Sequence, residues 1–93
     1  MHKQSFVTLY VYNRCSFSNK AKYLCKKHKL KHKVHDMENL GGKENVIKEL
    51  KNMGKIPKNS KHSTAPIVFV DGVFIGGCDE LENAIRKYIV YSK

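Results

Sequence analysis

Near the C-terminal end of the chain, two short apolar runs are separated by only two residues. The runs cover 67–70 (Ile-Val-Phe-Val) and 73–75 (Val-Phe-Ile), and Asp71-Gly72 lies between them. An Asp-Gly pair readily adopts the positive φ angles that a two-residue turn between antiparallel strands requires. The sequence therefore predicts a tight β-hairpin, which ends at Gly76-Gly77.

Upstream of the hairpin, the pattern alternates between strand and helix. A β-branched and aromatic run at 6–12 predicts a buried strand, and a second short strand is predicted at 33–37. Between the two strands, helical spacing places five residues on one face, which we expect to pack against the sheet: Phe17, Ala21, Leu24, Cys25 and His28. After the break at Gly41-Gly42, a second helical pattern follows at Val46, Ile47, Leu50 and Met53.

The remaining segments predict a loop and a last helix. The polar stretch 54–63 has no periodicity, so we expect a loop whose Lys and His side chains line a site. Asp79 is expected to cap the last helix, with Glu80 and Glu82 in the first turn, where the helix dipole favours acidic residues. The apolar positions of this helix are Leu81, Ala84, Ile85, Tyr88 and Ile89.

The predicted order of elements is βαβαββα. One crossover to a parallel strand, followed by a helix and an antiparallel hairpin, is packed most simply as one mixed four-stranded sheet with helices on both faces. We therefore expect an α/β fold in three layers. A chain of 93 residues has no room for a second hydrophobic core, so residues 1–93 are expected to form a single domain.

Composition bears on location and partners. No stretch approaches the ~20 consecutive apolar residues that span a bilayer, and three cysteines without framework spacing argue for a reducing compartment. We therefore expect a soluble cytoplasmic protein.

The net charge of +10 suggests nucleic-acid binding. However, 16 of the 18 basic residues are Lys, which lacks the planar guanidinium group with which Arg makes paired hydrogen bonds to phosphates and bases. We expect neither a specific nucleic acid nor a membrane as partner. The five His do not pair with Cys at zinc-finger spacing, so no structural metal site is expected.

Cys15 is the candidate nucleophile because it lies between the first predicted strand and the first predicted helix. Unpaired backbone N–H groups and the helix dipole favour a thiolate at a helix N-terminus, and Arg14 adds a nearby cation. Ser16 and Ser18 could donate hydroxyl hydrogen bonds to the sulfur. From position alone, an unreactive helix-capping cysteine is an equally good interpretation.

Four segments in the same order give the chain a resemblance to the glutaredoxin family. Cys15-Ser16-Phe17-Ser18 is similar to the family's Cys-x-x-Cys or Cys-x-x-Ser active site, and Thr64-Ala65-Pro66 is similar to its Thr-Val-Pro segment. Asp71-Gly72 resembles the family hairpin, and Gly76-Gly77-Cys78-Asp79 resembles its Gly-Gly-x-x-Asp region.

The resemblance implies a thioredoxin-like three-layer sandwich and a glutathione-dependent thiol-disulfide oxidoreductase. Cys15 would reduce protein–glutathione mixed disulfides, with glutathione as co-substrate and glutathionylated or disulfide-containing proteins as partners of a monomer. The family also implies a cis peptide bond before Pro66. The residues that would bind glutathione are Arg14, Phe17, Thr64, Ala65, Pro66, Gly77, Cys78 and Asp79.

The sequence departs from the family pattern at two positions. Ser18 occupies the position of the resolving cysteine, so an internal bridge is impossible there and the mechanism is expected to be monothiol. Tyr12 stands where the family usually has a basic residue for the glycyl carboxylate of glutathione, and Arg14, Lys58 or Lys61 are candidates to replace it.

We expect the other two cysteines to lie in different environments. Cys25 follows Cys15 by ten residues on one helix, which is about 15 Å, so we expect it in the core. Cys78 is expected near Cys15 across the glutathione groove, either as inert packing or as a slow resolving thiol.

The sequence is also compatible with two other functions. In one, two chains use Cys15 and two glutathiones to hold a [2Fe-2S] cluster, so that the protein is a cluster carrier or sensor and a dimer only in that state. In the other, the chain is a redox-inactive basic adaptor.

Overall fold

The computed structural model describes residues 6–12, 15–60 and 65–89. It contains four strands, β1 (Phe6–Val11), β2 (Lys31–Asp36), β3 (Ile67–Val70) and β4 (Val73–Gly76), and three α-helices, α1 (Ser16–Lys27), α2 (Lys43–Asn52) and α3 (Cys78–Ala84). A 3₁₀ turn, η1 (Met37–Leu40), precedes α2, and a π-helical turn, η2 (Ile85–Ile89), continues α3. The predicted order βαβαββα is confirmed.

The strands form one mixed sheet in the order β2-β1-β3-β4. β1 pairs with β2 in parallel and with β3 in antiparallel orientation, and β3 pairs with β4 antiparallel. The central strands β1 and β3 are apolar, whereas the edge strand β2 carries the run Lys-His-Lys. Charged side chains on an edge strand discourage pairing with other chains.

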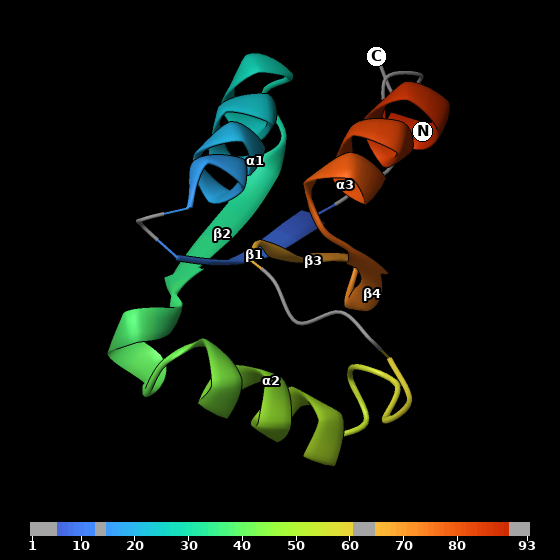
Figure 1. The fold of residues 1–93 in the computed structure, drawn as a ribbon. Coiled ribbons are helices and arrows are strands. Elements are labelled where there is room, and N and C mark those ends of the chain that lie inside the picture. Colours follow the sequence, from blue (N-terminus) through green and yellow to red (C-terminus); the bar gives the residue numbers. More distant parts are fainter. Residues whose placement is uncertain (1–5, 13–14, 61–64, 90–93) are drawn as a thin grey trace.

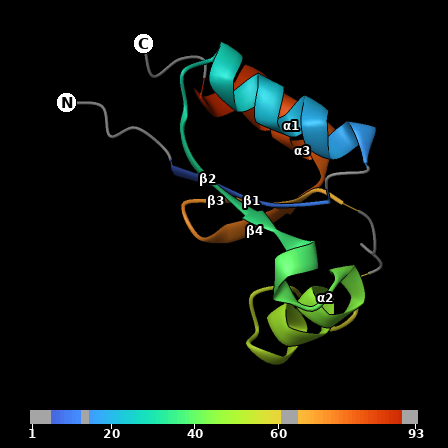
Figure 2. The same ribbon diagram turned by 90° about the vertical axis from the view of Figure 1, so that its left-hand side faces the viewer.

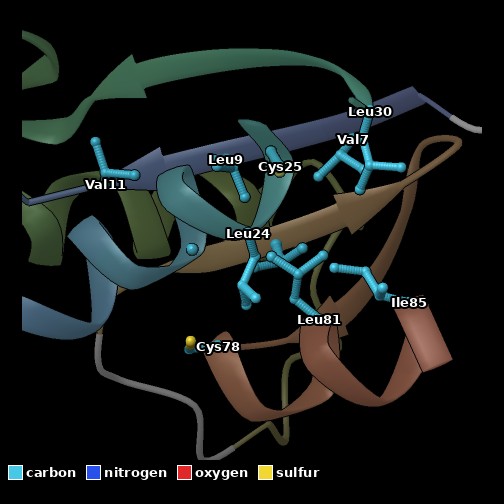
Figure 3. Packing of buried hydrophobic residues seen from close by; sticks show 11 residues of the cluster. Val7, Leu9, Val11, Leu24, Cys25, Leu30, Cys78, Leu81 and Ile85 are labelled. Atoms are coloured by element: carbon cyan, nitrogen blue, oxygen red, sulfur yellow. The ribbon is translucent and has the colours of Figure 1, made fainter. Parts of the chain in front are cut away.

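Helices α1 and α3 cover one face of the sheet, and α2 covers the other (Figures 1 and 2). Alternate residues of β1, namely Val7, Leu9 and Val11, point to the α1 and α3 face. There they pack in one buried cluster with residues of both helices (Figure 3), which include Ala21, Leu24, Cys25, Leu81 and Ile85. The three-layer arrangement expected from the sequence is therefore present.

The opposite face holds a second buried cluster beneath α2. Val46 and Leu50 of α2 pack on Ile67 and Phe69 of β3, together with Met37 and Ile56. Tyr10 of β1 extends this cluster, since the centre of its ring lies 4.8 Å from that of the stacked His35 ring on β2 and 5.8 Å from that of Phe69.

Within the described ranges, none of the helices has the length and apolar character needed to cross a membrane.

Three predicted core positions on helices are wrong. Phe17 is 57% exposed, His28 is exposed and Met53 is 63% exposed. All three lie at helix ends, where a side chain on the inward face can pass beyond the layer that it should pack against: Phe17 is the second residue of α1, and His28 and Met53 are the C-caps of α1 and α2. Ser18 takes the buried place at the start of α1 instead.

The start of α3 also differs from the prediction. Gly77, not Asp79, is the N-cap, and α3 begins at Cys78. The capping contact comes from Glu80, whose Oε1 accepts a 2.7 Å hydrogen bond from the Gly77 N–H. A glutamate three residues after the N-cap can cap the helix in this way when the N-cap residue has no polar side chain.

The hairpin turn and the following glycine use backbone conformations that favour glycine. Asp71 and Gly72 have φ values of 52° and 83°, as the two-residue turn requires. Gly76, the last residue of β4, has φ 126°, and a Cβ there would lie 2.5 Å from Glu80 Oε1. Gly76 therefore allows both the chain path and the Glu80 cap.

We expect Gly76→Ala to lower the free energy of unfolding by about 2 to 3 kcal/mol, because the added methyl group either strains the backbone or displaces the Glu80 cap. Gly54→Ala is the matched control. Gly54 also has positive φ, at 75°, but a Cβ at this position would have no neighbour within 4 Å, so a loss of about 1 kcal/mol is expected. Urea denaturation measures both variants, and equal losses would contradict the proposed role of the Glu80 contact.

Candidate active site

Cys15 lies at the junction between β1 and α1. It is the N-cap of α1, with an extended backbone, and its own N–H donates a 2.9 Å hydrogen bond to the Tyr12 carbonyl. The Cys15 carbonyl in turn accepts from the Asn19 N–H at 3.2 Å, which closes the first turn of the helix. The side chain is half-buried, so the thiol is held at the start of a helix and still open to solvent. The predicted position is confirmed.

The Cys15 thiol faces the segment that precedes β3. Its Sγ donates a 3.5 Å hydrogen bond to the Ala65 carbonyl, across a separation of fifty residues in sequence. The Ala65-Pro66 peptide bond is cis, as the family resemblance implies. The nucleophile candidate and the proline segment are therefore in direct contact.

A groove of about 1040 Å³ opens beside Cys15. Six of the residues predicted to bind glutathione line it: Phe17, Ala65, Pro66, Gly77, Cys78 and Asp79. The remaining two, Arg14 and Thr64, lie outside the described residues. The structure thus brings together three predicted segments that are far apart in sequence, around a groove of a size suited to a small ligand.

A third wall of the groove was not predicted. It is formed by η1, the two glycines that follow it and the start of α2, with the lining residues Glu38, Gly41, Gly42, Lys43 and Glu44. Tyr12 and Glu80 complete the lining. The signal that could have indicated this wall is topological: β1 and β2 are parallel, so the residues that follow both strands lie at the same edge of the sheet.

The loop predicted at 54–63 is described as far as residue 60, and residues 54–60 do not line the groove. Lys58 is exposed and is not a lining residue, and Lys61 lies outside the described residues. Ile56 from the same stretch is fully buried beneath α2, so part of this segment packs in the core. Of the three basic residues proposed for the glycyl carboxylate, Lys58 is thereby excluded from the groove wall.

The Ser18 hydroxyl is hydrogen-bonded to the backbone of Tyr12. Its side chain is fully buried, and its Oγ accepts a 3.1 Å hydrogen bond from the Tyr12 N–H. The sequence suggests a hydroxyl that donates to the Cys15 sulfur, whereas the bond found ties the first turn of α1 to the end of β1. Because Tyr12 also lines the groove, Ser18 fixes the backbone on which the groove is built.

The three thiols, all free, differ in burial and in charge environment. Burial raises the pKa of the Cys25 thiol to about 11, and this side chain is fully enclosed in the core, as predicted. Burial also raises the pKa of Cys78, and the charges of Asp79, Glu82 and Cys15 add to that effect against an opposing one from Lys20. Cys78 is only 5% exposed although it lines the groove.

The sheet order, the two helical layers and the cysteine that faces a cis-proline define a thioredoxin-like protein with a thiol active site. Residues 7–75 match the model of the family described as Glutaredoxin. The chain therefore belongs to the glutaredoxin family, whose members are thiol-disulfide oxidoreductases.

Solved structures agree with this fold. Glutaredoxin 1 from Francisella tularensis, in a crystal structure complexed with cacodylate, is similar with a TM-score of 0.71 and 24% identity, over 96% of this chain and 99% of that chain. The dithiolic glutaredoxin 2-C-Grx1 from Trypanosoma brucei brucei, solved in solution, has a TM-score of 0.69 and 26% identity, over 87% of this chain and 77% of that chain. None of the curated proteins compared with the chain matches it significantly.

We expect substoichiometric iodoacetamide at neutral pH to label Cys15 first, with Cys25 and Cys78 far slower. A raised pKa leaves a smaller thiolate fraction at neutral pH, and burial blocks access to what remains, so labelling of the two buried thiols should grow only as the pH rises. Peptide mapping by mass spectrometry measures the order, and labelling in denaturant, where all three should react alike, is the control. Equal labelling of Cys15 and Cys78 in the folded protein would contradict this assignment.

Proposed function

We propose that the chain is a glutathione-dependent oxidoreductase that reduces protein–glutathione mixed disulfides through Cys15 alone. The observation that carries the proposal is the contrast between residues 15 and 18. Cys15 is a half-buried thiol that opens on a large groove, whereas position 18 holds a fully buried hydroxyl committed to the Tyr12 backbone. A single accessible thiol beside a groove fits monothiol exchange.

The proposed reaction has two exchange steps. The Cys15 thiolate attacks the glutathionyl sulfur of a mixed disulfide, and the disulfide bond breaks so that the client thiolate leaves and takes up a proton. A second glutathione, as thiolate, then attacks the Cys15-bound glutathionyl sulfur. Glutathione disulfide leaves and the Cys15 thiolate is regenerated. In sum, the mixed disulfide and one free glutathione give the client thiol and glutathione disulfide. The client sulfur is reduced, the sulfur of the free glutathione is oxidised, and the glutathionyl sulfur taken from the client stays at the disulfide level.

The groove walls suggest how glutathione is oriented for both steps. The Ala65 backbone, beside Cys15, can pair with the extended tripeptide as a short antiparallel strand. At the start of α3, Asp79 is exposed and carries a carboxylate suited to the ammonium of the γ-glutamyl group. Holding the glutathionyl sulfur next to Cys15 lowers the entropic cost of the exchange.

The deciding experiment is a glutathione-dependent reduction assay on a glutathionylated peptide. We expect Cys15→Ser to abolish turnover, since the attacking sulfur is lost, and Cys25→Ser to retain most of it, since Cys25 is enclosed in the core between α1 and the sheet. Circular dichroism on each variant shows whether it is folded. Comparable losses in two folded variants would refute the role of Cys15.

The same protein preparation distinguishes the disulfide-exchange reaction from the cluster-binding interpretation. Anaerobically purified protein that is brown, with visible absorbance that Cys15→Ser removes, would favour a glutathione-ligated [2Fe-2S] cluster over the exchange reaction.

Oxidation by glutathione disulfide should give mainly the Cys15–glutathione adduct, with a minor Cys15–Cys78 bridge. Cys78 lies in the same groove as Cys15, but its burial and raised pKa make it a poor competitor for glutathione. Intact-mass measurement and peptide mapping determine the products, and Cys78→Ser, which cannot form the bridge, is the control. A quantitative Cys15–Cys78 disulfide without adduct would replace the monothiol mechanism with a dithiol one.

A further inference from the structure

The three α-helices all begin beside the groove, but they differ in the charge that they carry away from it. α2 carries three Lys and two Glu, so its charges are mixed. α3 carries three acidic residues and no basic one, whereas α1 carries four Lys and no acidic residue. Anionic partners are therefore attracted to the α1 side of the molecule and repelled from the start of α3.

The exposed side of α1 runs from the groove to the opposite end of the molecule (Figures 1 and 2). Four exposed residues follow one another at intervals of four, three and four, which places them in one line along the helix: Ser16, Lys20, Tyr23 and Lys27. We call this line, together with the exposed Lys26, the α1 face. It starts next to the candidate nucleophile and extends about 18 Å from it along the helix axis.

The acidic residues that could neutralise the α1 face lie mostly elsewhere. Of the eight in the chain, four line the groove, namely Glu38, Glu44, Asp79 and Glu80. Asp36 caps η1, Glu49 lies on α2, and Asp71 is held in the hairpin turn. The last one, Glu82 of α3, lies 4.0 Å from Lys20, in a pair of partly exposed side chains that contributes little in water. Most of the positive charge of the α1 face is therefore open to a partner.

Tyr23 gives the α1 face an apolar centre. Its side chain is 60% exposed. Lys20 lies three residues before it, and Lys26 and Lys27 lie three and four residues after it, so these lysines surround the ring on the helix surface. An aromatic residue with a charged rim is the usual composition of a protein–protein interface. α1 contains no Arg, the residue best suited to phosphate groups, so the composition favours a protein partner over a nucleic acid.

We propose that the α1 face docks an acidic surface of the client protein while the glutathionylated cysteine of the client lies at Cys15. The inference rests on the proposed function, because it takes a glutathionylated protein as the substrate. The acidic residues that line the groove repel an acidic client there, so the attraction is confined to α1 and orients the client along this helix. Docking lies outside the reacting atoms, so it raises kcat/KM for acidic clients through faster association and leaves the exchange chemistry unchanged.

The test compares glutathionylated peptides with and without an acidic segment. Tyr23 and Lys27 lie about 12 and 18 Å from Cys15 along the helix axis, distances that an extended peptide spans in roughly four to six residues. One peptide therefore carries a short run of Glu that starts about four residues from its cysteine, and its control carries Gln at the same positions. Both are made with the run before and with the run after the cysteine.

At low ionic strength, wild type should reduce the Glu peptide with a kcat/KM about tenfold higher than that for the Gln peptide, in at least one of the two directions. This preference should disappear in ~1 M salt, where the Debye length falls to ~3 Å. The double variant Lys26→Gln/Lys27→Gln removes two charges of the α1 face and should lower the preference to about threefold or less.

Lys48→Gln/Lys58→Gln is the matched control, since both side chains are exposed, on α2 and in the loop that follows it, and the change in net charge is equal. This variant should keep the wild-type preference. Turnover of the Gln peptide should be the same in all three proteins, which shows that each is folded and active.

Wild type that reduces both peptides equally in both directions, or equal loss of preference in the two double variants, would overturn the inference and leave the proposed function in place. Binding of a duplex oligonucleotide that depends on Lys26 and Lys27, without any preference for the Glu peptide, would assign the α1 face to nucleic acid instead. Wild type that reduces neither peptide would overturn the inference and the proposed function together.

Discussion

The position of β1 between a parallel and an antiparallel neighbour determines where the active site can form. β1 and β2 are parallel, so both end at the same edge of the sheet; β3 runs the opposite way and begins there, and β4 returns to it. Cys15, Lys43, Pro66 and Cys78 follow or precede these strand ends, and all four line one groove. The chemistry of the site therefore depends on strand pairing before it depends on any side chain.

Much of the fold could be predicted because its signals are local. The Asp71-Gly72 turn and the apolar run of β1 each indicate their structure within a few residues. The core positions on helices that were predicted wrongly lie at helix ends. Phe17, His28 and Met53 follow the periodicity of a buried face but sit where the packed layer ends, and helical spacing carries no information on where that layer ends.

The candidate site likewise contains some residues that local sequence patterns indicate and others that only the tertiary structure reveals. Cys15 and the proline and Gly-Gly segments have recognisable sequence patterns, and the structure places their described residues around the groove. Lys43 has no such pattern: it is one of 16 lysines, and only the parallel pairing of β1 with β2 separates it from the others. Ser18 has a hydroxyl that suggests a role beside the sulfur, but its burial against Tyr12 is a tertiary property that no local pattern reveals.

The hydrogen bond between Ser18 and the Tyr12 backbone also bears on how such a site can evolve. A single substitution could place cysteine at position 18 and add a second redox-active thiol. However, sulfur is a weaker acceptor than a hydroxyl oxygen, so the hydrogen bond from the Tyr12 N–H would be weakened. Gain of dithiol chemistry and loss of support for the β1–α1 turn would thus arrive in the same mutation. A substitution at this position is therefore expected to change conformational stability and redox mechanism together.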